Sequence, residues 1–120
     1  MVEDKHNQIY TGLFEYMKDL YPKLKGGTTY NENEVKLPFL CFYQLDAPTR
    51  AMDLSNNEVV VNLVFQIEVY TDLGSNQARK MANDVRRYML SQGFRCRNFM
   101  PLSTKTKVSR FVGRYERLDV

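Results

Sequence analysis

The sequence predicts an α+β fold, a two-layer sandwich in which two helices pack on one face of a mostly antiparallel sheet. This architecture is a variant of the ferredoxin-like fold. Two segments, 5–21 and 75–92, repeat apolar residues at helical spacing. Between them, residues 58–71 are apolar at every second position from Val59 to Val69, as in a strand with one buried face. The element order is helix, two or three strands, helix, two strands, and helices segregated to one face of an antiparallel sheet give this architecture. We expect one domain over residues 1–120.

The first helix is expected over residues 5–21. Asp4 can cap its start, because a carboxylate accepts a hydrogen bond from a free backbone N–H. Pro22 ends it by disfavouring helical geometry in the residue before. Gly12 in its middle costs about 1 kcal/mol relative to alanine. The face predicted to be buried is formed by Ile9, Leu13, Tyr16, Met17 and Leu20.

The next segments form the first part of the sheet. Residues 25–36 are polar and predict a turn or a short edge strand. Residues 37–46, "LPFLCFYQLD", predict a strand with Pro38 near its start, since proline cannot donate to the ladder. Residues 47–57 contain turn-forming residues and are expected to connect two strands without a tight hairpin.

The second helix is expected over residues 75–92. Ser75 or Asn76 can cap it, and Gly93 suits a left-handed stop. Its buried stripe is predicted to contain Ala78, Met81, Ala82, Val85 and Met89. Its outward face carries Arg79, Lys80, Asn83, Arg86 and Arg87.

Two strands, 94–103 and 108–120, complete the predicted sheet around a turn at 104–107. The strand 58–71, the helix 75–92 and the strand 94–102 form a β–α–β unit. The terminal strand and the strand 58–71 share one feature: the second face of each mixes apolar and polar residues. A half-buried strand normally has one apolar face and one polar, solvent-exposed face. We therefore expect a neighbouring surface to pack against these mixed faces.

Composition excludes several classes of protein. The chain has 120 residues, 43% of them apolar and 26% charged, which is typical of a globular protein. No apolar run approaches the roughly 18 residues of a membrane span, and the polar N-terminus does not resemble a secretory signal. We therefore expect a cytosolic protein without membrane contact. Cys41 and Cys96 are expected to be buried free thiols rather than a disulfide.

No catalytic or metal-binding constellation is visible in the sequence. His6, the one histidine, lies near the N-terminus and is expected to be solvated. There is no Cys/His spacing typical of a metal site, and "KGGTTY" lacks the frame of a phosphate-binding loop. Glu32 and Glu34 lie in a polar segment with nothing to raise a pKa. We predict a protein that is not an enzyme, with no cofactor and no small-molecule substrate.

Charge leaves one alternative open, a nucleic-acid-binding module. Residues 1–60 carry six basic and nine acidic residues, whereas residues 61–120 carry eleven and five. The fold overlaps that of RNA-binding sheets, which stack bases on exposed aromatic rings. Phe111 and Tyr115 could form such a surface, with Arg110, Arg114 and Arg117 on the phosphates. The aromatic motif of those modules is absent, because "RFVGRYER" has the wrong order.

Assembly with other protein chains is the favoured interpretation. Apolar residues rimmed by charge mark interaction surfaces, and arginine with aromatic residues is typical of interface cores. Arginines on the mixed faces would then pair with carboxylates of a neighbouring copy. The candidate residues for subunit or partner contacts are Arg50, Met52, Leu54, Arg79, Arg86, Arg87, Arg110, Arg114 and Arg117.

Five segments form a pattern along the chain: the N-terminal helix, "LPFLCFYQLD", "NLVFQIEVYTD", the helix "A..MANDVRRYML...GF" and "SRFVGRYER". As a set, they resemble the tail-terminator and head–tail joining (neck) proteins of long-tailed bacteriophages. The resemblance covers most of the chain. It implies a non-enzymatic virion protein that forms a homo-oligomeric ring, usually a hexamer, and joins the tail tube to the neck. It also implies assembly in the host cytoplasm and possible passage of DNA through the ring lumen.

Overall fold

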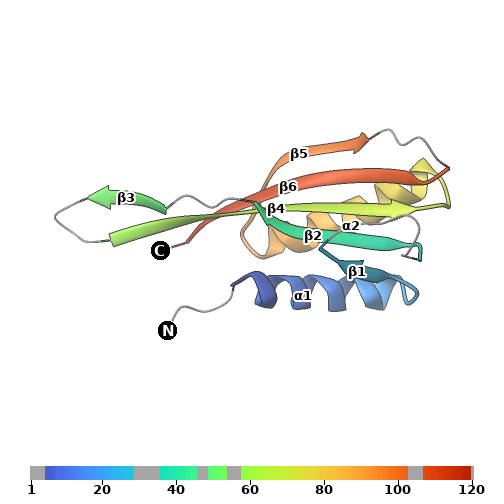
Figure 1. Cartoon of the computed structure of the whole chain (residues 1–120), viewed down its shortest axis with the longest axis horizontal. Coiled ribbons are helices and arrows are strands. Elements are labelled where there is room, and N and C mark those ends of the chain that lie inside the picture. Colours follow the sequence, from blue (N-terminus) through green and yellow to red (C-terminus); the bar gives the residue numbers. More distant parts are fainter. Residues whose placement is uncertain (1–4, 29–35, 46–48, 54–57, 103–106, 120) are drawn as a thin grey trace.

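The computed structural model describes residues 5–28, 36–45, 49–53, 58–102 and 107–119, and for residues 5–6, 49–53, 58–62 and 119 it describes the backbone. These residues form two helices, α1 (Lys5–Leu20) and α2 (Ser75–Ser91), and six strands, β1 (Lys25–Gly27), β2 (Phe39–Leu45), β3 (Thr49–Asp53), β4 (Glu58–Thr71), β5 (Arg95–Leu102) and β6 (Ser109–Asp119). The strands make one sheet in the order β1-β2-β4-β6-β5, and β3 also pairs with β4 (Figure 1). All described strand pairs are antiparallel except β1 with β2. The α+β two-layer prediction is confirmed.

The predicted β–α–β connection is present, with one strand inserted. β4 and β5 both run antiparallel to β6, which lies between them, so β4 and β5 are parallel to each other. Helix α2 crosses the sheet between them. The long strands β4 and β6 pair along 11 residues, from Val61 with Asp119 to Thr71 with Ser109.

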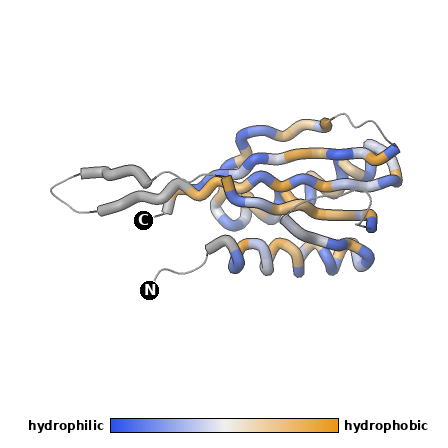
Figure 2. The backbone as a smooth tube through the Cα atoms, in the orientation of Figure 1, coloured by the Kyte–Doolittle hydropathy of each residue, from blue (hydrophilic) through white to orange (hydrophobic). Residues whose placement is uncertain are grey.

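The main core lies between the helices and one face of the sheet. The predicted stripe of α2 is buried throughout, and β4 contributes Leu63, Phe65, Ile67 and Val69. Three rings meet in this layer: the Phe65 ring centroid lies 4.9 Å from that of Phe42, which it stacks on, and 5.6 Å from that of Phe94, which it meets edge-on. Burial of side chains of this size contributes about 2 kcal/mol each. Figure 2 shows hydrophobic and hydrophilic residues alternating along the strands of this layer.

One residue of the predicted α1 stripe is not in the core. Ile9, Leu13 and Met17 are buried, but Leu20 is 49% exposed. It is the last residue of α1, beside the turn that leads to β1, and it lines a surface cavity. The prediction that Leu20 is buried is therefore wrong.

The ends of α2 confirm one of the two predicted signals. Gly93 has a φ of 87°, the left-handed conformation that glycine adopts without strain. The prediction of Ser75 or Asn76 as the cap is wrong, because α2 already begins at Ser75 and Gly74 holds the cap position without a side chain. Asp4, the predicted cap of α1, lies outside the described residues.

The connection predicted over residues 47–57 contains a strand. β3 pairs with the first residues of β4, from Thr49 with Val61 to Asp53 with Glu58. β4 extends past the end of β2, whose last partner is Val64. β3 thus continues along β4 in the direction of β2. Turn-forming residues on both sides of this segment masked its strand character in the sequence.

Candidate functional site

The face of the sheet opposite the helices carries the mixed residues that the sequence analysis singled out, and we call it the open face. Cross-strand partners in a sheet lie on the same face, and the register places Cys41, Glu68 and Val112 in one row across β2, β4 and β6. No described helix packs on this side (Figure 1). Its described side chains include Phe39, Cys41, Tyr43, Gln66, Glu68, Tyr70, Met100, Arg110, Val112, Arg114, Glu116 and Leu118.

Glu68 is the centre of a hydrogen-bonded cluster on the open face. It is 3% exposed. Tyr43 donates to its Oε2 at 2.7 Å, and Tyr70 donates to its Oε1 at 3.0 Å. Gln66 donates to Oε2 at 3.2 Å, and Arg110 forms an ion pair with Oε1. We call these five residues the Glu68 network. It joins β2, β4 and β6 on the open face, where no described helix packs.

The network holds Glu68 ionised. Burial alone would raise the pKa of Glu68, but hydrogen bonds from Tyr43, Gln66 and Arg110 and the charge of Arg110 outweigh it, so the pKa is lowered below its ordinary value. Burial and the bond to Glu68 raise the pKa of Tyr43 to about 12. A carboxylate with filled acceptor sites and a lowered pKa is poorly placed to act as an acid or base near neutral pH. The hydrogen bonds and the ion pair of the network therefore serve to link the strands.

A small apolar cluster adjoins the network. Phe39, Cys41 and Tyr70 are buried, with Leu37 and Val108 packed against them. Cys41 is a free thiol, and burial followed by the negative charge of Glu68 raises its pKa to about 11. The prediction of a buried free thiol is confirmed for Cys41. Cys96 is also free but only partly buried.

Outside the Glu68 network, the open face holds one donor without a partner among the described residues and two exposed apolar side chains. Arg114 donates from Nη2 to Gln66 at 3.0 Å, while its buried Nε has no hydrogen-bond partner within the described residues. Leu118 and Met100 lie on the same face and are 60% and 45% exposed. A buried unsatisfied donor costs free energy, and an exposed apolar side chain gains by being covered.

The structure separates the predicted interface arginines into groups. Arg110 already pairs with Glu68 of its own chain, and its contact with a neighbour's carboxylate stays a prediction. Arg117 donates from Nη1 to the carbonyl of Gln92 at 2.7 Å, and its guanidinium lies 4.6 Å from the Phe94 ring centroid. Arg114 retains a donor that has no partner among the described residues.

The arginines of α2 are exposed as predicted, but each has a contact within the chain. Arg79 lies over Phe111 at 5.8 Å and Arg86 over Phe99 at 5.5 Å. Arg87 lies 3.5 Å from Asp84. These cation–π contacts cover the edge of the core beside β5 and β6.

The remaining predicted residues are only partly placed. Arg50 and Met52 lie in β3, whose backbone alone is described, and Leu54 lies outside the described residues. Tyr43, Gln66 and Glu68 were not predicted from the sequence as residues of a site. An acidic residue among apolar neighbours on the mixed face of a long strand was the available signal, but its partners come from β2 and β6.

The base-stacking surface of the nucleic-acid alternative is not available. Phe111 and Tyr115 are 3% and 1% exposed and belong to the core under the helices. They lie on the opposite face of β6 from Arg110 and Arg114. These two rings therefore cannot stack on bases while the fold is intact.

Two further features are absent from the part of the chain that the structure describes, a metal-binding group and a membrane-spanning helix. It contains no group of three or more His, Cys, Asp or Glu residues that could hold a metal ion, and neither helix is long and apolar enough to cross a membrane. The side chain of His6 lies outside the described residues. No known protein-family model matches the sequence, and a search of curated proteins gave no match.

Proposed function

We propose that this protein is a non-enzymatic structural subunit of a phage virion, a ring-forming tail terminator or neck component that joins the tail tube to the head. In this proposal copies of the chain associate into a ring, with a hexamer as the expected size, and DNA passes through its lumen. The proposal combines the sequence resemblance with the state of the open face.

The observation that carries the proposal is the exposed apolar area of the open face. Leu118 and Met100 are exposed on this face, and the register places Arg114 between their two rows. Apolar side chains around an arginine are typical of the centre of a protein–protein interface. An apolar surface of another chain would cover Leu118 and Met100, and a carboxylate on that surface would pair with Arg114, which is partly exposed.

The projecting end of the sheet supports the same conclusion. Residues 58–60 of β4 extend beyond β6 and pair with β3 alone among the described strands. A two-stranded ribbon is marginally stable in water without a surface to pack against. Contact with another subunit would supply that surface.

The test is native mass spectrometry combined with light scattering at rising protein concentration, alone and with tail tubes of the same phage. We expect a discrete oligomer, and we expect Leu118→Arg to abolish it. Leu90→Arg is the matched control, because Leu90 is 45% exposed on α2, away from the open face. Equal melting temperatures would show that both variants fold. A chain that stays monomeric alone and with tail tubes would contradict the proposal.

A further inference from the structure

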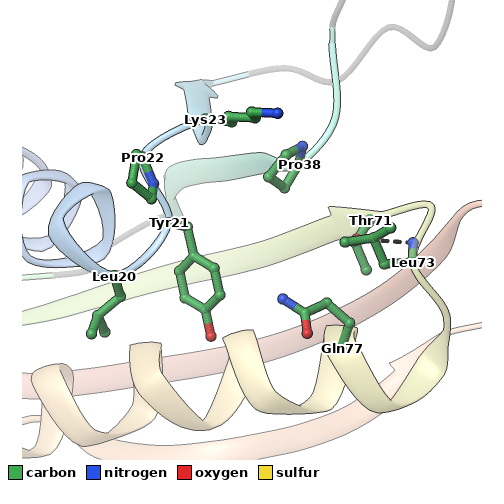
Figure 3. A pocket seen from close by; sticks show the side chains of 8 residues that line it. All are labelled: Leu20, Tyr21, Pro22, Lys23, Pro38, Thr71, Leu73 and Gln77. Carbon is green, nitrogen blue, oxygen red and sulfur yellow. Dashed lines mark hydrogen bonds between the residues drawn. The ribbon is translucent and has the colours of Figure 1, made fainter.

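A surface cavity of about 290 Å³ lies where the end of α1, the start of β2 and the turn between β4 and α2 meet (Figure 3). Pro22, Pro38 and the exposed Leu20 and Leu73 contribute apolar walls, with Leu73 72% exposed. The Tyr21 hydroxyl is already used, since it donates to Asp84 at 2.5 Å. This cavity, which we call the pocket, suits apolar side chains from another molecule.

The ribbon at the start of β4 is the complementary feature. We call the paired segments 49–53 and 58–60 the arm. Its sequence includes Ala51, Met52, Val59 and Val60. As a two-stranded ribbon it lacks a third strand or a helix to pack against among the described residues.

The arm and the pocket lie at opposite ends of the molecule. The arm is at the start of β4 and Thr71, at the end of the same strand, lines the pocket (Figure 1). A strand of 14 residues spans roughly 45 Å, and the molecule measures 55 Å along its longest axis. The arm therefore cannot reach the pocket of its own chain, whereas a second copy can bring the two together.

Charge favours the same pairing. By its sequence the arm carries Arg50, Asp53 and Glu58, and thus a net formal charge of −1. Of the described residues that line the pocket, Lys23 alone carries a charge. A lysine in the pocket would attract a segment of net negative charge.

We propose that the arm of one copy docks into the pocket of the next, so that the chains assemble head to tail. The inference rests on the proposed function and adds which surfaces join neighbouring subunits. Contacts of this type use two different patches on each subunit, and they close into a ring when the rotation between neighbours permits it.

Cross-linking between two single-site variants tests the contact directly. Ala51→Cys in the arm and Leu73→Cys in the pocket are prepared separately, one of them isotopically labelled, then mixed and treated with a short bismaleimide. We expect covalent dimers that contain one labelled and one unlabelled chain. Asn83→Cys, on the exposed side of α2, is the control for the pocket and should give a several-fold lower yield. The chain without an added cysteine, treated in the same way, measures the background from Cys41 and Cys96.

A charge exchange provides the second readout. Lys23→Glu in the pocket variant should reduce the yield of arm–pocket dimer several-fold, and Glu58→Lys in the arm variant should restore it. Native mass spectrometry of the unmodified chain separates the two proposals. An oligomer without arm–pocket dimers overturns this inference and leaves the proposed function standing. Cross-linking of the pocket to tail-tube protein in place of the arm also overturns it. A strictly monomeric chain, alone and with tail tubes, overturns the proposed function itself.

Discussion

Arg110 and Glu68 form an ion pair on the face of the sheet that no described helix covers. The Arg110 guanidinium also lies 5.7 Å from the centroid of the Tyr70 ring, whose hydroxyl donates to the same carboxylate. The pair thus links β4 to β6 at a position that would otherwise expose an acidic residue between apolar neighbours. Breaking such a pair from one side leaves an uncompensated charge, which is costly.

Glu68→Gln should make the protein less stable at neutral pH by about 2 kcal/mol, because hydrogen bonds to a buried charge are lost. The pKa of Glu68 is lowered in the folded state relative to its ordinary value of 4.5. The stabilisation it provides is therefore fully present above pH 4.5 and disappears as the pH falls through the lower folded pKa. Denaturant unfolding of both proteins between pH 2 and pH 7, a range set to span ordinary carboxyl pKa values, measures this difference.

Glu116→Gln is the control for this experiment. Glu116 lies on the same face of β6 and pairs with Arg97 at 2.6 Å, but the Arg97 side chain is 56% exposed. An exposed ion pair contributes less than about 1 kcal/mol. Equal losses in the two variants would show that the Glu68 network does not have the role assigned to it.

Gly12→Ala tests the contact between α1 and α2. Alanine would improve helix propensity by about 1 kcal/mol, but a Cβ at this position would collide with the Tyr88 hydroxyl. We expect net destabilisation in thermal unfolding. Tyr88→Phe removes the hydroxyl and leaves the next ring atom 3.4 Å from the added Cβ, so Gly12→Ala should stabilise the protein in that background. Destabilisation of the same size in both backgrounds would contradict this explanation of Gly12.

Local sequence patterns predicted both helices, the strands β2, β4, β5 and β6, and most of the core, since these depend on periodicity within one segment. The bounds of β4 agree with the predicted 58–71, and the buried stripe of α2 agrees residue by residue. The Glu68 network escaped prediction because Tyr43 and Arg110 are brought to Glu68 by the strand register. The same register decided which face of β6 is buried, and local alternation alone left that undecided.

The two thiols should react slowly with a disulfide reagent at pH 8 in the folded protein. Burial and the charge of Glu68 raise the pKa of Cys41 to about 11, so very little thiolate is present. Burial raises the pKa of Cys96 as well, though Arg86 opposes the effect, and Cys96 is partly accessible. We expect Cys96 to react first and Cys41 only on unfolding, with Cys96→Ala identifying each phase. Rapid modification of Cys41 in the folded chain would contradict the packing described for the open face.

Arg114→Met should separate stability from assembly. The variant loses one hydrogen bond to Gln66 but also removes a buried Nε that has no partner in the described residues, so unfolding free energy should change by less than about 1 kcal/mol. Assembly, measured by native mass spectrometry, should be lost. Arg110→Met is the contrasting variant: it leaves Glu68 buried without its cation and should cost about 3 kcal/mol. Unimpaired oligomers from Arg114→Met would show that this arginine is not a contact between subunits.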